Sequence, residues 1–138
     1  MFLDASAMLA ILLAEDDAGI YLARLEGATT RIYTSPIARF EAIVSIARAK
    51  SRPSRTTPML IEAATVLVDK FIAEIKAQQI TISPDIGQRA VEASASYGKI
   101  AGHPAKLNLG DCFAYGAAKT YRLPLIYKGD DFKETDIG

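Results

Sequence analysis

Short strand-like segments alternate along this chain with longer segments of helical periodicity, and that alternation restricts the possible folds more than any other feature. The strand-like segments are Phe2-Leu3, 31–34, 80–82 and 123–127. The segments between them carry apolar residues at three- and four-residue spacing, as amphipathic helices do. Strands that alternate with helices predict an α/β fold with a mainly parallel central sheet flanked by helices. The length of 138 residues predicts one domain, 1–138.

Capping residues predict where the helices begin. Ser6 is expected to cap a helix over 7–14, and Glu15 to open a second helix that ends at Gly27. Ser35-Pro36 and Ser83-Pro84 combine a capping serine with a proline at the first helical position. The helices that we expect from the remaining periodicity are 37–50, 58–79, 84–97 and 109–121, the last one capped by Asn108.

Four acidic residues occupy positions that suggest a common site. Asp4 and Asp131 each follow a predicted strand, Asp111 lies at a helix start, and Glu41 shares a helix face with apolar Ile37 and Val44. Ligands of open α/β sheets bind outside the carboxyl ends of the strands. Helix starts face the same edge, so we expect Asp4, Glu41, Asp111 and Asp131 to converge there.

Each acid also has an ordinary structural explanation. Asp4 could be an exposed turn residue, Glu41 could pair with an arginine, and Asp111 could only cap its helix. Asp130 and Asp131 lie in a turn, where acids are common. The set is more informative than its members, because neighbouring carboxylates repel one another unless a cation lies between them.

The chain contains one cysteine, Cys112, and one histidine, His103. These counts exclude a thiolate zinc cluster and a site built from several histidines. Any metal must therefore be held by oxygen atoms, which favours Mg²⁺ or Mn²⁺. Such an ion can polarise a phosphodiester and activate a water molecule for in-line attack, so the acids point to phosphodiester hydrolysis.

Charge and hydropathy add weaker information. The 16 basic and 16 acidic residues cancel, so net charge gives no argument for nucleic-acid binding. The segment from Arg48 to Arg55 is basic without an acid, and it is either an RNA-backbone contact or a solvated connection. The N-terminus has no signal-peptide pattern, and the longest apolar stretch, 5–14, is too short to span a membrane. We expect no membrane association and a cytoplasmic location.

Several motifs resemble the PIN-domain family, and within it the VapC-type toxins of type II toxin–antitoxin systems. They are the N-terminal Phe-Leu-Asp-Ala-Ser-Ala, the helix of Glu41, the segment Asn-Leu-Gly-Asp-Cys-Phe-Ala-Tyr from Asn108, and the ending Leu-Ile-Tyr-Lys-Gly-Asp-Asp-Phe-Lys-Glu-Thr-Asp. The resemblance covers essentially the whole chain. It implies a three-layer sandwich and an endoribonuclease toxin that depends on Mg²⁺ or Mn²⁺.

The resemblance also implies roles for individual residues. Asp4 and Asp111 would be direct metal ligands, Glu41 would complete the cluster directly or through water, and Ser6 and Asn108 would orient the carboxylates. For the fourth acid we choose Asp131 over Asp130, because Phe132 should anchor the turn beside it. The implied partners are RNA, a second copy of the chain in a homodimer, and a cognate antitoxin whose C-terminal segment covers the acidic groove.

Two other families and an inactive form of this fold are the alternatives to this assignment. A receiver domain needs an acidic pair after the first strand, and here Asp4 stands alone. A haloacid-dehalogenase-like phosphatase needs Asp-x-Asp at that strand, and position 6 is serine. The remaining alternative is a catalytically inactive PIN fold that acts as an RNA-binding or scaffold module.

Overall fold

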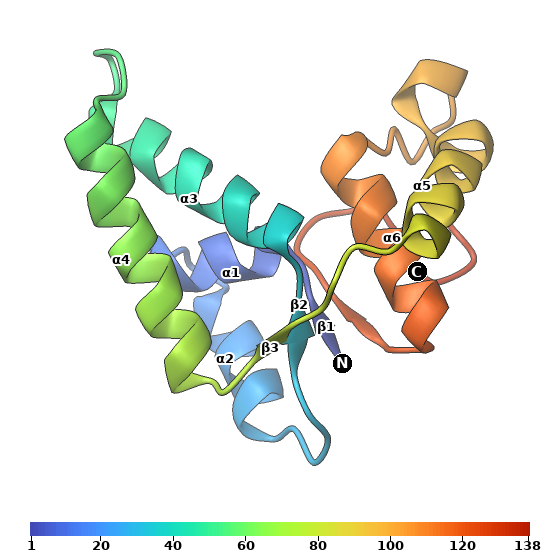
Figure 1. The fold of residues 1–138 in the computed structure, drawn as a ribbon, viewed down its shortest axis with the longest axis horizontal. Coiled ribbons are helices and arrows are strands. Elements are labelled where there is room, and N and C mark those ends of the chain that lie inside the picture. Colours follow the sequence, from blue (N-terminus) through green and yellow to red (C-terminus); the bar gives the residue numbers. More distant parts are fainter.

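A sheet of four parallel strands, in the order β3-β2-β1-β4, runs through the middle of the molecule (Figure 1). The computed structural model describes all residues, 1–138. The elements along the chain are β1 (Phe2–Leu3), α1 (Ala5–Leu12), α2 (Ala18–Glu26), β2 (Tyr33–Thr34), α3 (Pro36–Ser51), α4 (Pro58–Glu74), β3 (Gln78–Gln79), α5 (Pro84–Tyr97), the 3-10 helix η1 (Lys99–Ala101), α6 (Leu109–Tyr121) and β4 (Leu125–Ile126). The prediction of an α/β fold with a parallel sheet is confirmed.

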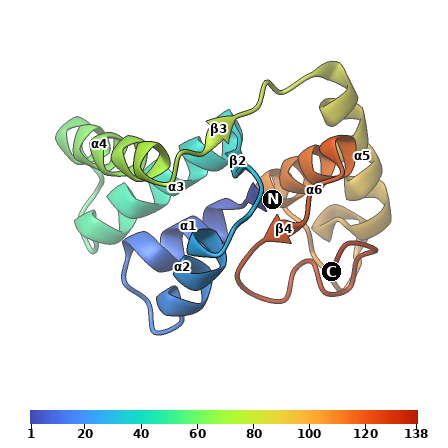
Figure 2. The same cartoon turned by 90° about the horizontal axis from the view of Figure 1, so that it is seen from below.

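Two neighbouring strands, β1 and β4, send alternate side chains to two separate cores. Phe2 of β1 and Leu125 of β4 are directly paired and pack with α5 and α6. Leu3 and Ile126 are the next pair and pack with α1, α3 and α4. Figure 2 shows these two groups of helices on opposite sides of the strands. The three-layer sandwich is therefore a direct consequence of the two-residue period of the strands.

Three helices begin in the same way, with a hydroxyl cap followed by proline. The side chains of Ser35, Thr57 and Ser83 each accept a hydrogen bond from the backbone N–H of the third helical residue. Proline follows each of them, where its missing N–H costs nothing. The predicted starts at Ser35-Pro36 and Ser83-Pro84 are thus confirmed.

None of the helices is long and apolar enough to cross a lipid bilayer.

The predicted cap of the first helix is wrong. Asp4, and not Ser6, caps α1: its backbone is extended and its carboxylate accepts the N–H of Ser6, so the helix begins at Ala5. The second helix begins at Ala18 rather than at Glu15, and Glu15 and Asp17, which precede it, are paired with Lys128.

The end of α4 and the position of β3 also differ from the prediction. The helix ends at Glu74 instead of Gln79, and Lys76 takes a left-handed conformation with φ of 53° that no helix continues through. The chain then enters the sheet earlier than expected, so β3 is Gln78–Gln79 rather than 80–82. Pairing with Tyr33 and Thr34 of β2 sets this register, and local sequence does not reveal it.

The turn after β4 is held by Phe132, which is 1% exposed and packs edge-on against Tyr127 with ring centroids 4.9 Å apart. We predict that Phe132→Ala lowers the free energy of unfolding by about 3–5 kcal/mol, because it empties a buried aromatic site. Val66→Ala on α4 is the control, since Val66 is 69% exposed and its truncation should change stability by less than about 0.5 kcal/mol. Urea unfolding measures both, and equal effects would contradict this view of the turn.

Candidate active site

Asp4 lies at the carboxyl end of β1 and is almost fully buried, with 4% exposure. Its Oδ2 accepts hydrogen bonds from the backbone N–H of Ser6 at 3.0 Å and from the Ser6 hydroxyl at 2.5 Å. The Ser6 oxygen in turn accepts the backbone N–H of Lys128 at 2.9 Å. Ser6 therefore joins Asp4 to the segment after β4. Burial raises the pKa of Asp4, although the hydrogen bonds from Ser6 oppose that rise.

Glu41 projects from α3 toward the start of α6. The fully buried side of α3 is made by other residues, including Ala42 and Ile46, so Glu41 lies half-buried beside the core rather than within it. A methyl group placed on Gly110 would overlap the Glu41 carboxylate. Burial, and then the negative charges of Asp4 and Asp111, raise the pKa of Glu41 to about 7.

Asp111 is the third residue of α6 and belongs to a capping box. The Asn108 side chain accepts the N–H of Asp111 at 2.9 Å, and the Asp111 carboxylate accepts the N–H of Asn108 at 3.0 Å. The Asp111 carboxylate is thus held by the backbone N–H of Asn108, and not by the Asn108 side chain. Burial raises the pKa of Asp111 to about 6, with further contributions from the charges of Asp4 and Asp131.

The two acids of the final turn have different surroundings. Asp130 forms an ion pair with Lys133. Asp131 has no ion-pair partner, and its negative charge raises the pKa of both Asp4 and Asp111. Buried Phe132 holds the backbone beside it. The charge of Asp131, and not that of Asp130, therefore acts on Asp4 and Asp111.

The four carboxylates form a cluster whose charge the protein does not balance. Each of them raises the pKa of a neighbour or has its own pKa raised by one. None is among the acids that form ion pairs, which are Glu15, Asp17, Asp69, Glu74, Asp130 and Asp136. Clustered acids without a cation are typical of sites that bind a metal or a cationic ligand.

The donor set fits a hard divalent cation, because every available ligand atom is an oxygen. As the side chains stand, however, no three acidic, histidine or cysteine side chains lie close enough together to hold one ion. Binding would therefore require the carboxylates to move closer together. Attraction to the ion and relief of their mutual repulsion both favour that movement.

Sequence reasoning missed two contributors to this site. Gly110 gives Glu41 room beside α6, and its signal was a glycine directly before the acid of a helix start. Lys128 donates its backbone N–H to Ser6 and pairs its ammonium group with Glu15 and Asp17, which lie between α1 and α2. The sequence around Lys128, a lysine after an apolar strand, does not indicate that its ammonium group pairs with Glu15 and Asp17.

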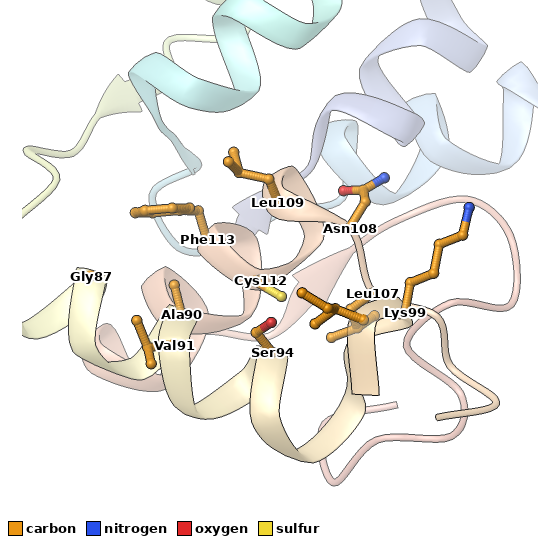
Figure 3. A pocket seen from close by; sticks show the side chains of 11 residues that line it. Gly87, Ala90, Val91, Ser94, Lys99, Leu107, Asn108, Leu109, Cys112 and Phe113 are labelled. Atoms are coloured by element: carbon orange, nitrogen blue, oxygen red, sulfur yellow. The ribbon is translucent and has the colours of Figure 1, made fainter. Parts of the chain in front are cut away.

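A mainly apolar hollow lies apart from the acids. Its volume is about 530 Å³ and it lies between α5, which contributes Ala90 and Ser94, and α6, which contributes Cys112 and Phe113 (Figure 3). Asn108 is its only residue in common with the site described above. Cys112 is buried, as a small core residue should be.

Comparisons with known proteins agree with this architecture. The PIN domain family matches residues 1–138. A VapC ribonuclease of Rhizobium meliloti is 46% identical over 142 residues, which cover 99% of this chain and 99% of the relative. Ribonuclease VapC28 of Mycobacterium tuberculosis is 35% identical over 99% of this chain and 95% of its own length.

Solved structures show the same fold at lower identity. The toxin VapC20 of Mycobacterium tuberculosis, described as cleaving the sarcin-ricin loop, superposes with a TM-score of 0.75 at 14% identity, over 99% of this chain and 95% of the toxin. A toxin–antitoxin complex from Klebsiella pneumoniae gives a TM-score of 0.66 at 19% identity, over 98% of this chain and 92% of the matched chain.

These findings confirm the resemblance inferred from the sequence, and none of them favours the inactive alternative. The chain belongs to the PIN-domain family, in which its relatives are VapC ribonucleases.

Proposed function

We propose that this protein is the endoribonuclease toxin of a toxin–antitoxin pair, and that it hydrolyses RNA phosphodiesters at the cluster of Asp4, Glu41, Asp111 and Asp131 with Mg²⁺ or Mn²⁺. The observation that carries the proposal is the set of clustered carboxylates without a cation of their own. The ribonuclease relatives, which extend over the whole chain, support the choice of RNA as substrate.

In this proposal Asp4 and Asp111 hold the ion directly. Hydrogen bonds orient both carboxylates, Asp4 through the backbone and hydroxyl of Ser6 and Asp111 through the capping box with Asn108, and the cluster would contract from this arrangement around the ion. A bound divalent ion supplies positive charge that polarises the scissile phosphodiester and makes water a better nucleophile. Glu41 and Asp131 would add further negative charge to the site, and Glu41, whose pKa is raised to about 7, would be the residue to accept a proton from water.

We also propose the partners that follow from this function. A toxin of this kind requires an antitoxin, and the acidic cluster suits an inhibitor that inserts an arginine, because a guanidinium competes with the metal for the same oxygens. The complex from Klebsiella pneumoniae is a precedent for such pairing among proteins of this fold. We propose in addition that the toxin is a homodimer.

The first prediction concerns Asp4. Asp4→Asn keeps the side-chain shape and a cap for α1 but removes a charged ligand, so RNA cleavage should fall by more than about 100-fold, the upper cost of losing an outer-shell partner. Cleavage of total RNA with Mg²⁺, with Mn²⁺ and with EDTA measures this effect. Asp130→Asn is the matched control and should leave cleavage unchanged, because Asp130 pairs with Lys133. Full activity of Asp4→Asn would contradict the site assignment.

The second prediction concerns Gly110. Gly110→Ala should displace the Glu41 carboxylate and lower cleavage by about 100-fold, as a misplacement of 1 Å can do. Gly19→Ala on α2 is the control, because a methyl group there meets nothing within 4 Å. Circular dichroism should show both variants folded. If Gly110→Ala cleaves RNA as fast as the parent protein, cleavage does not depend on the present position of the Glu41 carboxylate.

The third prediction links pH, metal and stability. The folded-state pKa of Glu41 is raised from 4.5 to about 7, and that of Asp111 from 3.8 to about 6. A raised carboxyl pKa means that folding disfavours the charged form, so the metal-free protein should lose stability as pH rises from about 4 to 7. Thermal unfolding should show this loss, a larger gain from Mg²⁺ at pH 8 than at pH 5, and a smaller pH dependence in Glu41→Gln. If the metal-free protein instead became more stable between pH 4 and pH 7, the proposed repulsion among the carboxylates would be wrong.

A further inference from the structure

The outer end of α3 and the turn after it carry basic residues that nothing in the molecule neutralises. Arg48, Lys50, Arg52 and Arg55 are all exposed, and no acid occurs between positions 48 and 55. The chain's ion pairs instead use Arg39, Lys70, Lys119, Lys128 and Lys133. The uncompensated charge at this end of α3 is available to an anionic ligand.

Two of these residues continue the face of α3 that bears Glu41. At 100° per residue, Arg48 returns to within about 20° of the direction of Glu41 and lies about 10 Å farther along the helix axis. Arg52, the first residue after the helix, continues the same line for about another 6 Å. The opposite side of α3 is buried in the core with α1 and α4. A row of positive charge, formed by Arg48 and Arg52, therefore lies on the exposed outer part of α3, on the side of the helix that bears Glu41 and in the direction that α3 takes away from the sheet (Figure 1).

Phe40 lies on the inner part of α3, about 100° around the helix axis from Glu41. It directly precedes Glu41, its side chain is 64% exposed, and it belongs to neither hydrophobic core. Val44, one helical turn farther on, is half-buried and lies between Phe40 and Arg48 in helical projection. An exposed aromatic ring beside clustered acids, followed by unpaired cations, is the combination that binds unpaired nucleotides by stacking and phosphate contact.

We propose that this face of α3 binds a single-stranded segment of RNA next to the scissile bond, with a base stacked on Phe40 and backbone phosphates on Arg48 and Arg52. The inference rests on the proposed ribonuclease function and assigns where its substrate lies. The acidic cluster repels the RNA backbone, so attraction has to come from cations at a distance from it. Stacking needs a base whose face is free, which selects single strands over paired ones.

The test measures RNA binding separately from cleavage. In the Asp4→Asn background, and without metal, the affinity for a fluorescent single-stranded RNA of mixed sequence is measured over a range of salt concentrations. Arg48→Glu with Arg52→Glu should weaken binding by about tenfold and reduce the slope of log affinity against log salt by about 1.4, because each lost phosphate contact of a single strand removes about 0.7. The control is Arg24→Glu with Arg89→Glu, which changes the net charge equally at two exposed residues of α2 and α5 and should alter binding far less.

The aromatic contact has its own variants. Phe40→Ala should weaken binding by about tenfold without changing the salt slope, and Phe40→Tyr should retain the affinity, because its ring still stacks. Equal binding by the Arg48/Arg52 and Arg24/Arg89 double variants, or normal binding by Phe40→Ala, would overturn the proposal. So would a change in oligomeric state with unchanged RNA binding, because this face would then be an interface between copies. Failure of the wild-type protein to cleave RNA would instead count against the proposed function.

Discussion

The mutual repulsion of four carboxylates that no lysine or arginine balances is the constraint on which the rest of this structure depends. The order of the sheet makes β1 and β4 neighbours, which brings the segments after them, with Asp4 and Asp131, to one edge. The capping box of α6 and the bare backbone of Gly110 bring in Asp111 and Glu41. Such an arrangement opposes folding unless a cationic ligand offsets the repulsion, and it is typical of functional sites.

The neutral composition of the chain conceals a separation of charge. Acidic and basic residues are equal in number, at 16 each. However, Glu41, in the first half of α3, lies near other acids, whereas basic residues without ion-pair partners occupy the end of the helix. Other charged residues form ion pairs within the protein, such as Lys128 with Glu15 and Asp17. Net charge therefore says little about the partner of this protein, whereas the position of each unpaired charge says a great deal.

Local chemistry made much of this structure predictable. The strand–helix alternation, the Ser-Pro helix starts and the Asn108 cap depend on neighbouring residues, and all of them were read correctly from sequence. The errors arose where distant segments decide the outcome. Strand β3 takes its register from β2. Asp4 caps α1 in place of Ser6, whose hydroxyl instead donates to Asp4 and accepts the backbone N–H of Lys128, 122 residues farther along the chain. The space that Gly110 leaves for Glu41 likewise depends on how α6 packs beside α3, which the local sequence does not determine.

The central claim is that these carboxylates jointly hold a divalent ion, and a crystal of the protein soaked in Mn²⁺ would test it most directly. The account predicts one strong anomalous peak in contact with carboxylate oxygens of both Asp4 and Asp111, with Glu41 and Asp131 drawn toward it, and no such peak in crystals of Asp4→Asn. A manganese ion bound only elsewhere on the surface, or an empty cluster at saturating Mn²⁺ near neutral pH, would contradict the account.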